Sequence, residues 1–292
     1  MARRLVECVP NFSEGKDQAR VASIASAIAG GAGVVVLDRE MDPDHNRSVI
    51  TFVAPPEAVV QAAVRGVESA VALIDLTRHT GVHPRIGAAD VVPIVPLEGV
   101  TLEECAALAH QAGEAIWQRL RVPVFFYEAA ARQPERRNLA AIRRGPLRDF
   151  DMGGPSAHPT AGATAVGARG FLIAYNVALA TTDVEIARRI ARLVRGSSGG
   201  FRFVKAMGVF LESRKLAQVS MNLVDFAQTP VEQLYDAIVN EAASAGVAVA
   251  ASELVGMIPR SAYKMAPRFY ERCANFHSGL IIENRLPIAV SG

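Results

Sequence analysis

Histidine, arginine and aspartate side chains are concentrated in one short segment, residues 79–90, which reads HTGVHPRIGAAD between two apolar stretches. A histidine can accept and donate protons near neutral pH, and neighbouring polar groups can orient its ring. Within the segment, His83 has Arg85 and Asp90 as close neighbours in sequence. We therefore predict an active-site loop in which His83 is the proton-transferring group.

Metal binding is an alternative use of the two histidines in this segment. His79 and His83 are four residues apart, a spacing that places both rings on one face of a helix, as in zinc-binding HExxH motifs. Gly81 and Pro84 disfavour such a helix, because glycine destabilises helices and proline disfavours helical geometry in the residue before it. Although His45 could supply a further ligand, the chain has neither a helical HExxH motif nor clustered cysteines, so no metal is expected.

A glycine-rich run at residues 151–170 is the second segment with possible ligand contacts. Glycines allow the backbone to approach a ligand closely and to expose amide donors to it. The run contains no Gly-Lys-Ser/Thr sequence and no dinucleotide fingerprint, so it is neither a P-loop nor a Rossmann loop. We predict that it contacts a ligand between two domains, while an interdomain linker is the alternative.

Two shorter polar clusters could contact the same ligand. Asn11 and Ser13 lie at the end of an expected strand. Asp44, His45, Asn46 and Arg47 lie just before another. The two clusters would lie close together if their strands are neighbours in a sheet.

The composition is that of a compact globular protein. The chain has 292 residues, of which 50% are hydrophobic, enough for one large domain or two of average size. No window approaches the roughly 18 apolar residues of a membrane helix, and no signal peptide is recognisable, so a cytoplasmic location is expected. A net charge of +2 without a basic tract argues against nucleic-acid binding.

The periodicity of apolar residues predicts alternating strands and helices in the first half of the chain. The expected elements are, in order, residues 5–9, 17–29, 33–38, 48–54, 55–71 and 91–95, which gives βαββαβ. A helix capped by Thr101 and Glu104 and a strand at 122–127 extend this unit. An arginine-rich stretch at 131–150, with a short helix at about 138–144, marks the expected domain boundary.

The second half repeats the same order of elements. They are expected at residues 171–176, 184–194, 203–211, 216–223, 230–245 and 247–254. Thr182 with Glu185, and Thr229 with Glu232, are predicted to form capping boxes. The predicted fold class is therefore α/β (α+β), with two tandem ferredoxin-like βαββαβ domains, 1–150 and 151–292, around an interdomain cleft.

Apolar and polar side chains alternate along residues 216–223, which predicts a strand with one polar face. Gln218, Ser220 and Asn222 share that face. They could contact the ligand, or they could have no function if the face is exposed to solvent.

Seven long motifs occur in an order that matches a known family. They are VECVPNFSEG (6–15), HNRSVITFV (45–53), HTGVHPRIGAADVVP (79–93), GATAVGAR (162–169), LIAYNV (172–177), AQVSMNL (217–223) and SELVGMIP (252–259). Together they resemble the glutamate formimidoyltransferase family over residues 3–260. The resemblance implies transfer of a formimino group from N-formimino-L-glutamate to N5 of tetrahydrofolate, in histidine degradation, by a stand-alone form of the enzyme.

The resemblance also implies roles for individual residues. His83 matches the catalytic histidine of the family, and residues 153–162 match its folate-binding loop. The residues expected to bind the substrates are Asn11, Ser13, His45, Arg47, His79, Arg85, Asp90, Gly153, Gly154, Pro155, Ser156, Gly162 and Asn222. Because both substrates carry carboxylates, Arg47 and Arg85 are candidates to bind them in bidentate fashion, and Arg143 and Arg144 are candidates for the folate tail.

Tetrahydrofolate is expected as co-substrate, without a metal, nucleic-acid or membrane partner. The family resemblance suggests a homodimer and a separate cyclodeaminase as functional partner. Two other activities stay open from the sequence: closure of 5-formyltetrahydrofolate to the methenyl form in a cyclo-ligase type reaction, and a non-catalytic folate- or amino-acid-binding module.

Overall fold

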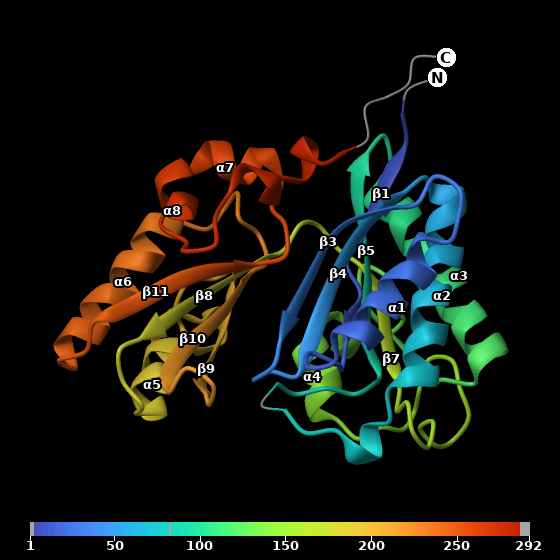
Figure 1. Cartoon of the computed structure of the whole chain (residues 1–292), viewed down its shortest axis with the longest axis horizontal. Coiled ribbons are helices and arrows are strands. Elements are labelled where there is room, and N and C mark those ends of the chain that lie inside the picture. The colour runs from blue at the N-terminus through green and yellow to red at the C-terminus, as the bar shows by residue number, and fades with distance from the viewer. Residues whose placement is uncertain (1–2, 82, 287–292) are drawn as a thin grey trace. The chain divides into compact units, whose positions relative to one another are not determined.

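The computed structural model describes residues 3–81 and 83–286, and it divides into two compact units, Met1–Gly170 and Phe171–Gly292 (Figure 1). The strand β7 (Thr164–Ala168) belongs to the first unit, because it pairs in parallel with β5 (Ala89–Glu98) and with β6 (Val124–Glu128). The boundary expected between residues 150 and 151 therefore lies inside the first unit.

The first unit begins with the expected βαββαβ order. Its elements before β5 are β1 (Leu5–Cys8), β2 (Asn11–Phe12), α1 (Gln18–Ala29), β3 (Val35–Asp42), β4 (Arg47–Ala54) and α2 (Pro56–Leu73). Both β1 and β2 pair antiparallel with β4 on one side and β5 on the other, so together they fill one strand position. They are separate strands because Pro10, which lies between them, has no N–H to donate.

Two strands, β7 and β6, extend this sheet beyond β5 and run parallel to it. The chain leaves β5 through α3 (Leu102–Leu120) to β6, and it then passes through α4 (Leu139–Arg144) to β7. The last strand lies between β5 and β6 rather than at the edge. The helix at 138–144 expected from the sequence corresponds to α4.

Helices cover both faces of the seven-stranded sheet. Side chains of α1, α2 and α3, which lie side by side in Figure 1, pack with Val92 and Ile94 of β5 in the larger core. Val91 points to the opposite face and packs with Ile142 of α4 in a smaller cluster, as the alternation of side chains along a strand requires. The sheet therefore holds α4 on the face opposite to α1–α3.

The second unit is a four-stranded antiparallel sheet with the predicted βαββαβ order. Its elements are β8 (Ile173–Leu179), α5 (Val184–Val194), β9 (Val204–Leu211), β10 (Leu216–Leu223), α6 (Val231–Ser244) and β11 (Val249–Val255). The strands lie in the order β11-β8-β10-β9, and two short helices, α7 (Arg260–Met265) and α8 (Pro267–Glu271), follow the last strand. The predicted fold class, with two tandem α/β units, is confirmed.

The two faces of β10 differ as the sequence alternation predicts. Ala217, Val219 and their apolar neighbours on the strand lie in the core of the second unit. On the other face Gln218 is fully buried, and its amide has no hydrogen-bond partner within residues 3–81 and 83–286. At Gln218, therefore, this face of β10 is buried and not exposed to solvent.

One of the three predicted helix caps is confirmed. The Thr101 hydroxyl accepts from the Glu104 amide at 3.2 Å, and the Glu104 carboxylate accepts from the Thr101 amide at 2.8 Å, which completes the predicted capping box. At α5 the cap is Asp183 rather than Thr182, because the Asp183 carboxylate accepts from the Glu185 amide at 2.9 Å.

The third predicted cap, at α6, is also wrong. Pro230 precedes the helix and offers no side-chain acceptor. The Thr229 hydroxyl donates instead to the carbonyl oxygen of Asp225 at 2.5 Å, so it closes the preceding turn and does not cap the helix.

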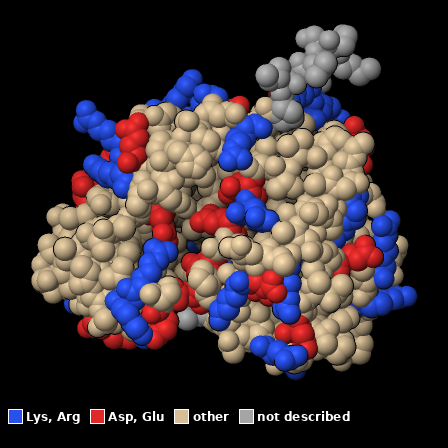
Figure 2. Space-filling model, viewed as in Figure 1, with Lys and Arg blue, Asp and Glu red and all other residues tan. Residues whose placement is uncertain are grey.

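The surface carries both signs of charge. On the face shown in Figure 2, basic and acidic side chains are interspersed. No helix in the part of the chain that the structure describes is long and apolar enough to cross a membrane.

The two threonines allow the cap assignment to be tested. Thr101→Ala is expected to lower the free energy of unfolding by about 1 kcal/mol, because the backbone amide of Glu104, in the first turn of α3, loses its acceptor. Thr182→Ala removes an exposed hydroxyl that caps no helix, and it is expected to change stability by less than about 0.5 kcal/mol. Urea unfolding of both variants measures the difference, and equal losses would contradict the assignment.

Candidate active site

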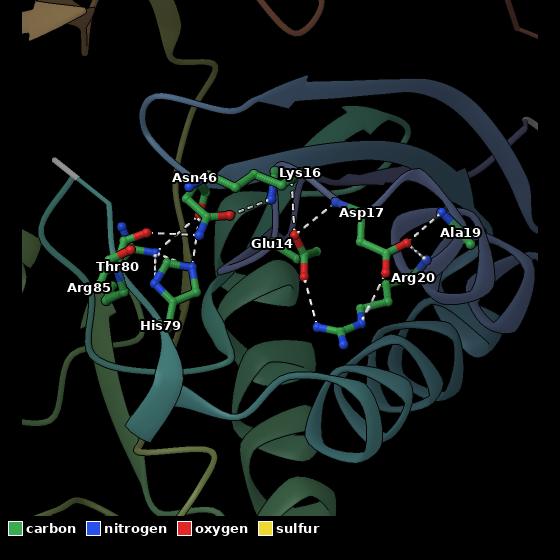
Figure 3. A network of polar contacts seen from close by, with 10 residues as sticks. Glu14, Lys16, Asp17, Ala19, Arg20, Asn46, His79, Thr80 and Arg85 are labelled. Carbon is green, nitrogen blue, oxygen red and sulfur yellow. Dashed lines mark hydrogen bonds and ion pairs between the residues drawn. The ribbon is translucent and has the colours of Figure 1, made fainter. Parts of the chain in front are cut away.

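Asn46 joins the histidine loop to two other segments of the first unit. It follows β3 and has a left-handed backbone with φ +46°. Its side-chain nitrogen donates to the Thr80 carbonyl at 2.8 Å, and its side-chain oxygen accepts from the Gly15 amide at 3.0 Å (Figure 3). The histidine loop is thus fastened both to the β3–β4 hairpin and to the turn after β2.

Arg85 fastens the same loop from the other side. Its Nη2 donates to the carbonyl oxygens of His45 and His83, each at 2.9 Å, and its Nη1 donates to that of Asn46 at 3.0 Å. Nη1 also contacts the ring of His79 at 2.7 Å. Burial, and after it the charge of Arg85, lowers the pKa of His79, so this ring is held uncharged.

Gly81 makes this packing possible. A Cβ at this position would lie 2.5 Å from Nη2 of Arg85 and 2.6 Å from the carbonyl oxygen of His45. Only a residue without a side chain fits where the loop backbone crosses the hairpin. The glycine that argued against a helix in the sequence is therefore required by a close backbone approach.

His83 is held by Arg47, the first residue of β4. The Arg47 Nη1 lies 2.5 Å from Nε2 and 3.2 Å from Nδ1 of His83, and since a guanidinium can only donate, a hydrogen bond at the nearer nitrogen requires Nε2 to be the acceptor. Burial lowers the pKa of His83 well below its usual value, and the charges of Arg47 and Arg143 lower it further. His83 is therefore neutral at physiological pH and has the lone pair that a base needs.

A second histidine lies beside the first. The rings of His45 and His83 are 6.0 Å apart, and Nδ1 of His45 lies 2.7 Å from the carboxylate of Asp42. Asp42 has a lowered pKa despite its partial burial, because His45 donates to it. The carboxylate thus fixes the orientation of the His45 ring.

Asp90 carries the negative charge next to Arg47 and Arg143 and is almost fully buried, with 1% exposure. One carboxylate oxygen accepts from the Ile86 amide at 2.8 Å, and the other forms an ion pair with Arg143 of α4. Burial and the charge of Arg143 lower the pKa of Arg47 to about 10. Arg47, Arg143 and Asp90 thus form a buried charged cluster next to His83.

The end of the histidine loop is built on Ser13 and on the glycine-rich run. The Ser13 hydroxyl donates to the Gly87 carbonyl at 2.7 Å, and Gly87 in turn bridges to Gly162, which has φ +69°. Asn11 donates instead to the Val9 carbonyl at 2.8 Å. The structure therefore brings Ser13, the histidine loop and the end of the glycine-rich run together.

The remaining expected site residues lie elsewhere. Gly153, Pro155 and Ser156 are exposed, and Gly154 next to them is partly buried. Asn222 belongs to β10 of the second unit. Their contacts with a ligand stay predictions. In the described ranges, no group of three or more His, Cys, Asp or Glu residues is placed to hold a metal ion.

Three features of the site were missed in the sequence. They are the role of Asn46, the Asp42–His45 pair and the ion pair between Arg143 and Asp90. Asn46 stands in a recognised motif, but nothing there distinguishes it from its neighbours. Arg143 was one of several arginines in a basic stretch.

Comparison with known proteins identifies the class. Residues 5–169 match the family described as formiminotransferase domain, N-terminal subdomain, and residues 174–291 match the formiminotransferase domain. The chain therefore belongs to the formiminotransferase domain family, which confirms the resemblance seen in the motifs.

Individual relatives are similar over most of the chain. It is 43% identical to a glutamate formimidoyltransferase of Thermoplasma acidophilum, covering 98% of this chain and 99% of the relative. It is 41% identical to one of Streptococcus pyogenes serotype M1, covering 97% and 99%. A formimidoyltransferase-cyclodeaminase of Gallus gallus is 42% identical over 91% of this chain, which spans 52% of that longer protein.

Asn46 is expected to stabilise the site in two separable ways. Asn46→Gly keeps the left-handed backbone but loses both side-chain hydrogen bonds, so the free energy of unfolding should fall by about 1–3 kcal/mol. Asn46→Ala should lose about 1 kcal/mol more, because alanine is strained at positive φ. Urea unfolding measures both variants.

A control separates the backbone effect from the hydrogen bonds. Lys215 is exposed and has φ +53°, so Lys215→Gly should leave stability unchanged or raised. Equal stability of the two Asn46 variants would contradict the strain argument, and an unaffected Asn46→Gly would contradict the role of the hydrogen bonds.

The pKa of His83 is expected to rise when Arg47 is replaced by methionine, because a neighbouring positive charge is removed while burial remains. Since the ring is a base only above its pKa, the acid limb of the activity profile should move to higher pH. Titration of the His83 ring by NMR measures the shift. Arg78→Met, an exposed change just before the loop, should leave it unaltered; a constant or lower pKa in Arg47→Met contradicts the assignment.

Proposed function

We propose that this protein transfers the formimino group of N-formimino-L-glutamate to N5 of tetrahydrofolate and releases L-glutamate. The observation that carries the proposal is a histidine kept neutral by burial and by Arg47, in a chain that belongs to the formiminotransferase domain family. Two relatives named glutamate formimidoyltransferase, which are similar to this chain over nearly their whole length, support this activity.

His83 moves the proton in the proposed mechanism. N5 of tetrahydrofolate attacks the amidine carbon of the donor, and His83 accepts the proton that N5 loses. The tetrahedral intermediate then breaks its bond to the glutamate nitrogen, which takes the same proton from the His83 imidazolium. The positive surroundings make that imidazolium a ready donor, because they disfavour its charged form. No net proton is consumed by the protein.

We also propose a folate-binding segment, an oligomeric state and a partner for this protein. The residues 153–162 contact folate, the protein is a cytoplasmic homodimer, and its product is passed to a cyclodeaminase. Relatives that are named formimidoyltransferase-cyclodeaminase support the last of these, since both activities occur in their names.

Replacing His83 by alanine tests the mechanism. The turnover number with N-formimino-L-glutamate is expected to fall about 10²–10⁴-fold, while the Kd for tetrahydrofolate stays within a few fold. His277→Ala, an exposed histidine in the second unit, should behave as the wild type. Undiminished turnover in His83→Ala would refute the role of this residue.

The same assay decides between the proposed activity and its rivals. Wild-type protein supplied with 5-formyltetrahydrofolate should form the methenyl product more slowly than it transfers the formimino group. Faster closure would favour the cyclo-ligase type reaction. Folate binding with no product from either donor would favour a binding module.

A further inference from the structure

We propose that Arg47 and Arg143 bind the α-carboxylate of the donor, and that this carboxylate replaces His83 as the partner of Arg47. The inference rests on the proposed function and adds to it a substrate group, the two residues that recognise it, and a step that frees the base. Three features support it: the excess positive charge next to His83, the hydrogen-bond donors without a partner, and the covalent structure of N-formimino-L-glutamate.

The cluster next to His83 has more positive than negative charge. Arg47 and Arg143 share one carboxylate, Asp90, both of whose oxygens are already used by Arg143 and by the Ile86 amide. Tyr127, which also faces Arg47, stays neutral because burial raises its pKa to about 12. A partly buried cation without a counter-ion is unfavourable, so a bound anion would stabilise the cluster.

Both guanidinium groups also have unused donors. Nε of Arg47 and Nε of Arg143 are buried and have no hydrogen-bond partner in the described part of the chain. Buried polar atoms are nearly always paired, and a carboxylate accepts from guanidinium groups through two oxygens at once. A carboxylate bound at this cluster would give the two donors an acceptor.

Arg85 does not fit this role, although its position in the motif suggested it. Its terminal nitrogens donate to the carbonyl oxygens of His45, Asn46 and His83. Using them for a substrate would release the histidine loop. Arg85 is thus a residue that shapes the loop, and Arg143, on α4, takes its place as the second arginine of the binding site.

The covalent structure of the donor selects its α-carboxylate. Arg47 lies 2.5 Å from His83, and His83 must come within hydrogen-bond distance of the reacting nitrogens. The α-carboxylate is attached to the carbon that bears the leaving nitrogen, whereas the γ-carboxylate lies two methylene groups further away. Only the nearer carboxylate reaches Arg47 while the amidine carbon stays beside His83.

Binding of that carboxylate prepares the base. As Arg47 turns to the carboxylate, Nε2 of His83 loses its donor and its lone pair becomes available. The added negative charge also raises the pKa of His83 toward its usual value, which strengthens it as a base. His83 therefore becomes available as a base only when a donor with an α-carboxylate is bound.

Donor analogues test the inference. N-formimino-4-aminobutyrate lacks the α-carboxylate, and N-formimino-L-2-aminobutyrate lacks the γ-carboxylate. Wild-type kcat/KM should fall about 30-fold or more for the first relative to N-formimino-L-glutamate. In Arg143→Met, kcat/KM for N-formimino-L-glutamate should fall. The ratio of this kcat/KM to that for N-formimino-4-aminobutyrate should shrink to a few fold. Arg137→Met, an exposed change in the same stretch, should keep the wild-type ratio.

A binding experiment gives a readout that does not need turnover. Titration of the His83 ring by NMR should show a higher pKa with saturating L-glutamate than without it, and no rise with 4-aminobutyrate. Circular dichroism and tetrahydrofolate affinity show whether Arg143→Met is folded. If Arg143→Met does not fold, the kcat/KM ratio of the wild type for the two donors and the NMR titration still test the inference.

The possible failures are distinguishable. Equal use of the glutamate and 4-aminobutyrate donors by the wild type, or an unchanged donor ratio in folded Arg143→Met, overturns the carboxylate site but leaves the proposed function intact. An unchanged His83 pKa with bound L-glutamate overturns the release of the base. If the wild type uses no formimino donor, the proposed function and this inference both fail.

Discussion

The buried carboxylate of Asp90 is the interaction on which the surroundings of His83 depend. It stands on β5 in the middle of the seven-stranded sheet, accepts from the loop at Ile86 and pairs with Arg143 of α4. One side chain thus ties the sheet, the histidine loop and the helix on its outer face together. Without this negative charge, Arg47 and Arg143 would repel each other, and Arg47 would not be kept beside His83.

The reactive side chain sits on a loop, but the loop has little freedom. Asn46 and Arg85 fasten it to the β3–β4 hairpin, and Ser13 fastens its end near the glycine-rich run. A base works only when it is held in position, and here polar contacts to the backbone do this together with the burial of Ile86 and Ala88 at the end of the loop. Binding energy that would otherwise order the loop is therefore available for recognising the donor.

Much of the architecture could be predicted from local sequence patterns. The strand at 216–223, the capping box at Thr101 and the order of both units follow from periodicity and cap residues. The caps at Thr182 and Thr229 failed because neighbouring Asp183 and the turn at Asp225 compete for the same groups. The ion pair of Arg143 with Asp90 joins residues 53 positions apart, and no local pattern identifies such a partner.

The position of β7 has a consequence for how the first unit forms. Because β7 is inserted between β5 and β6, one edge of β5 stays open and β6 lacks its partner strand until the ribosome has released residues 164–168. A nascent chain that ends at residue 150 would expose the unpaired edges of two buried strands, which invite pairing with other chains. β7, which lies inside the glycine-rich run, therefore sets the earliest point in synthesis at which the first unit can close.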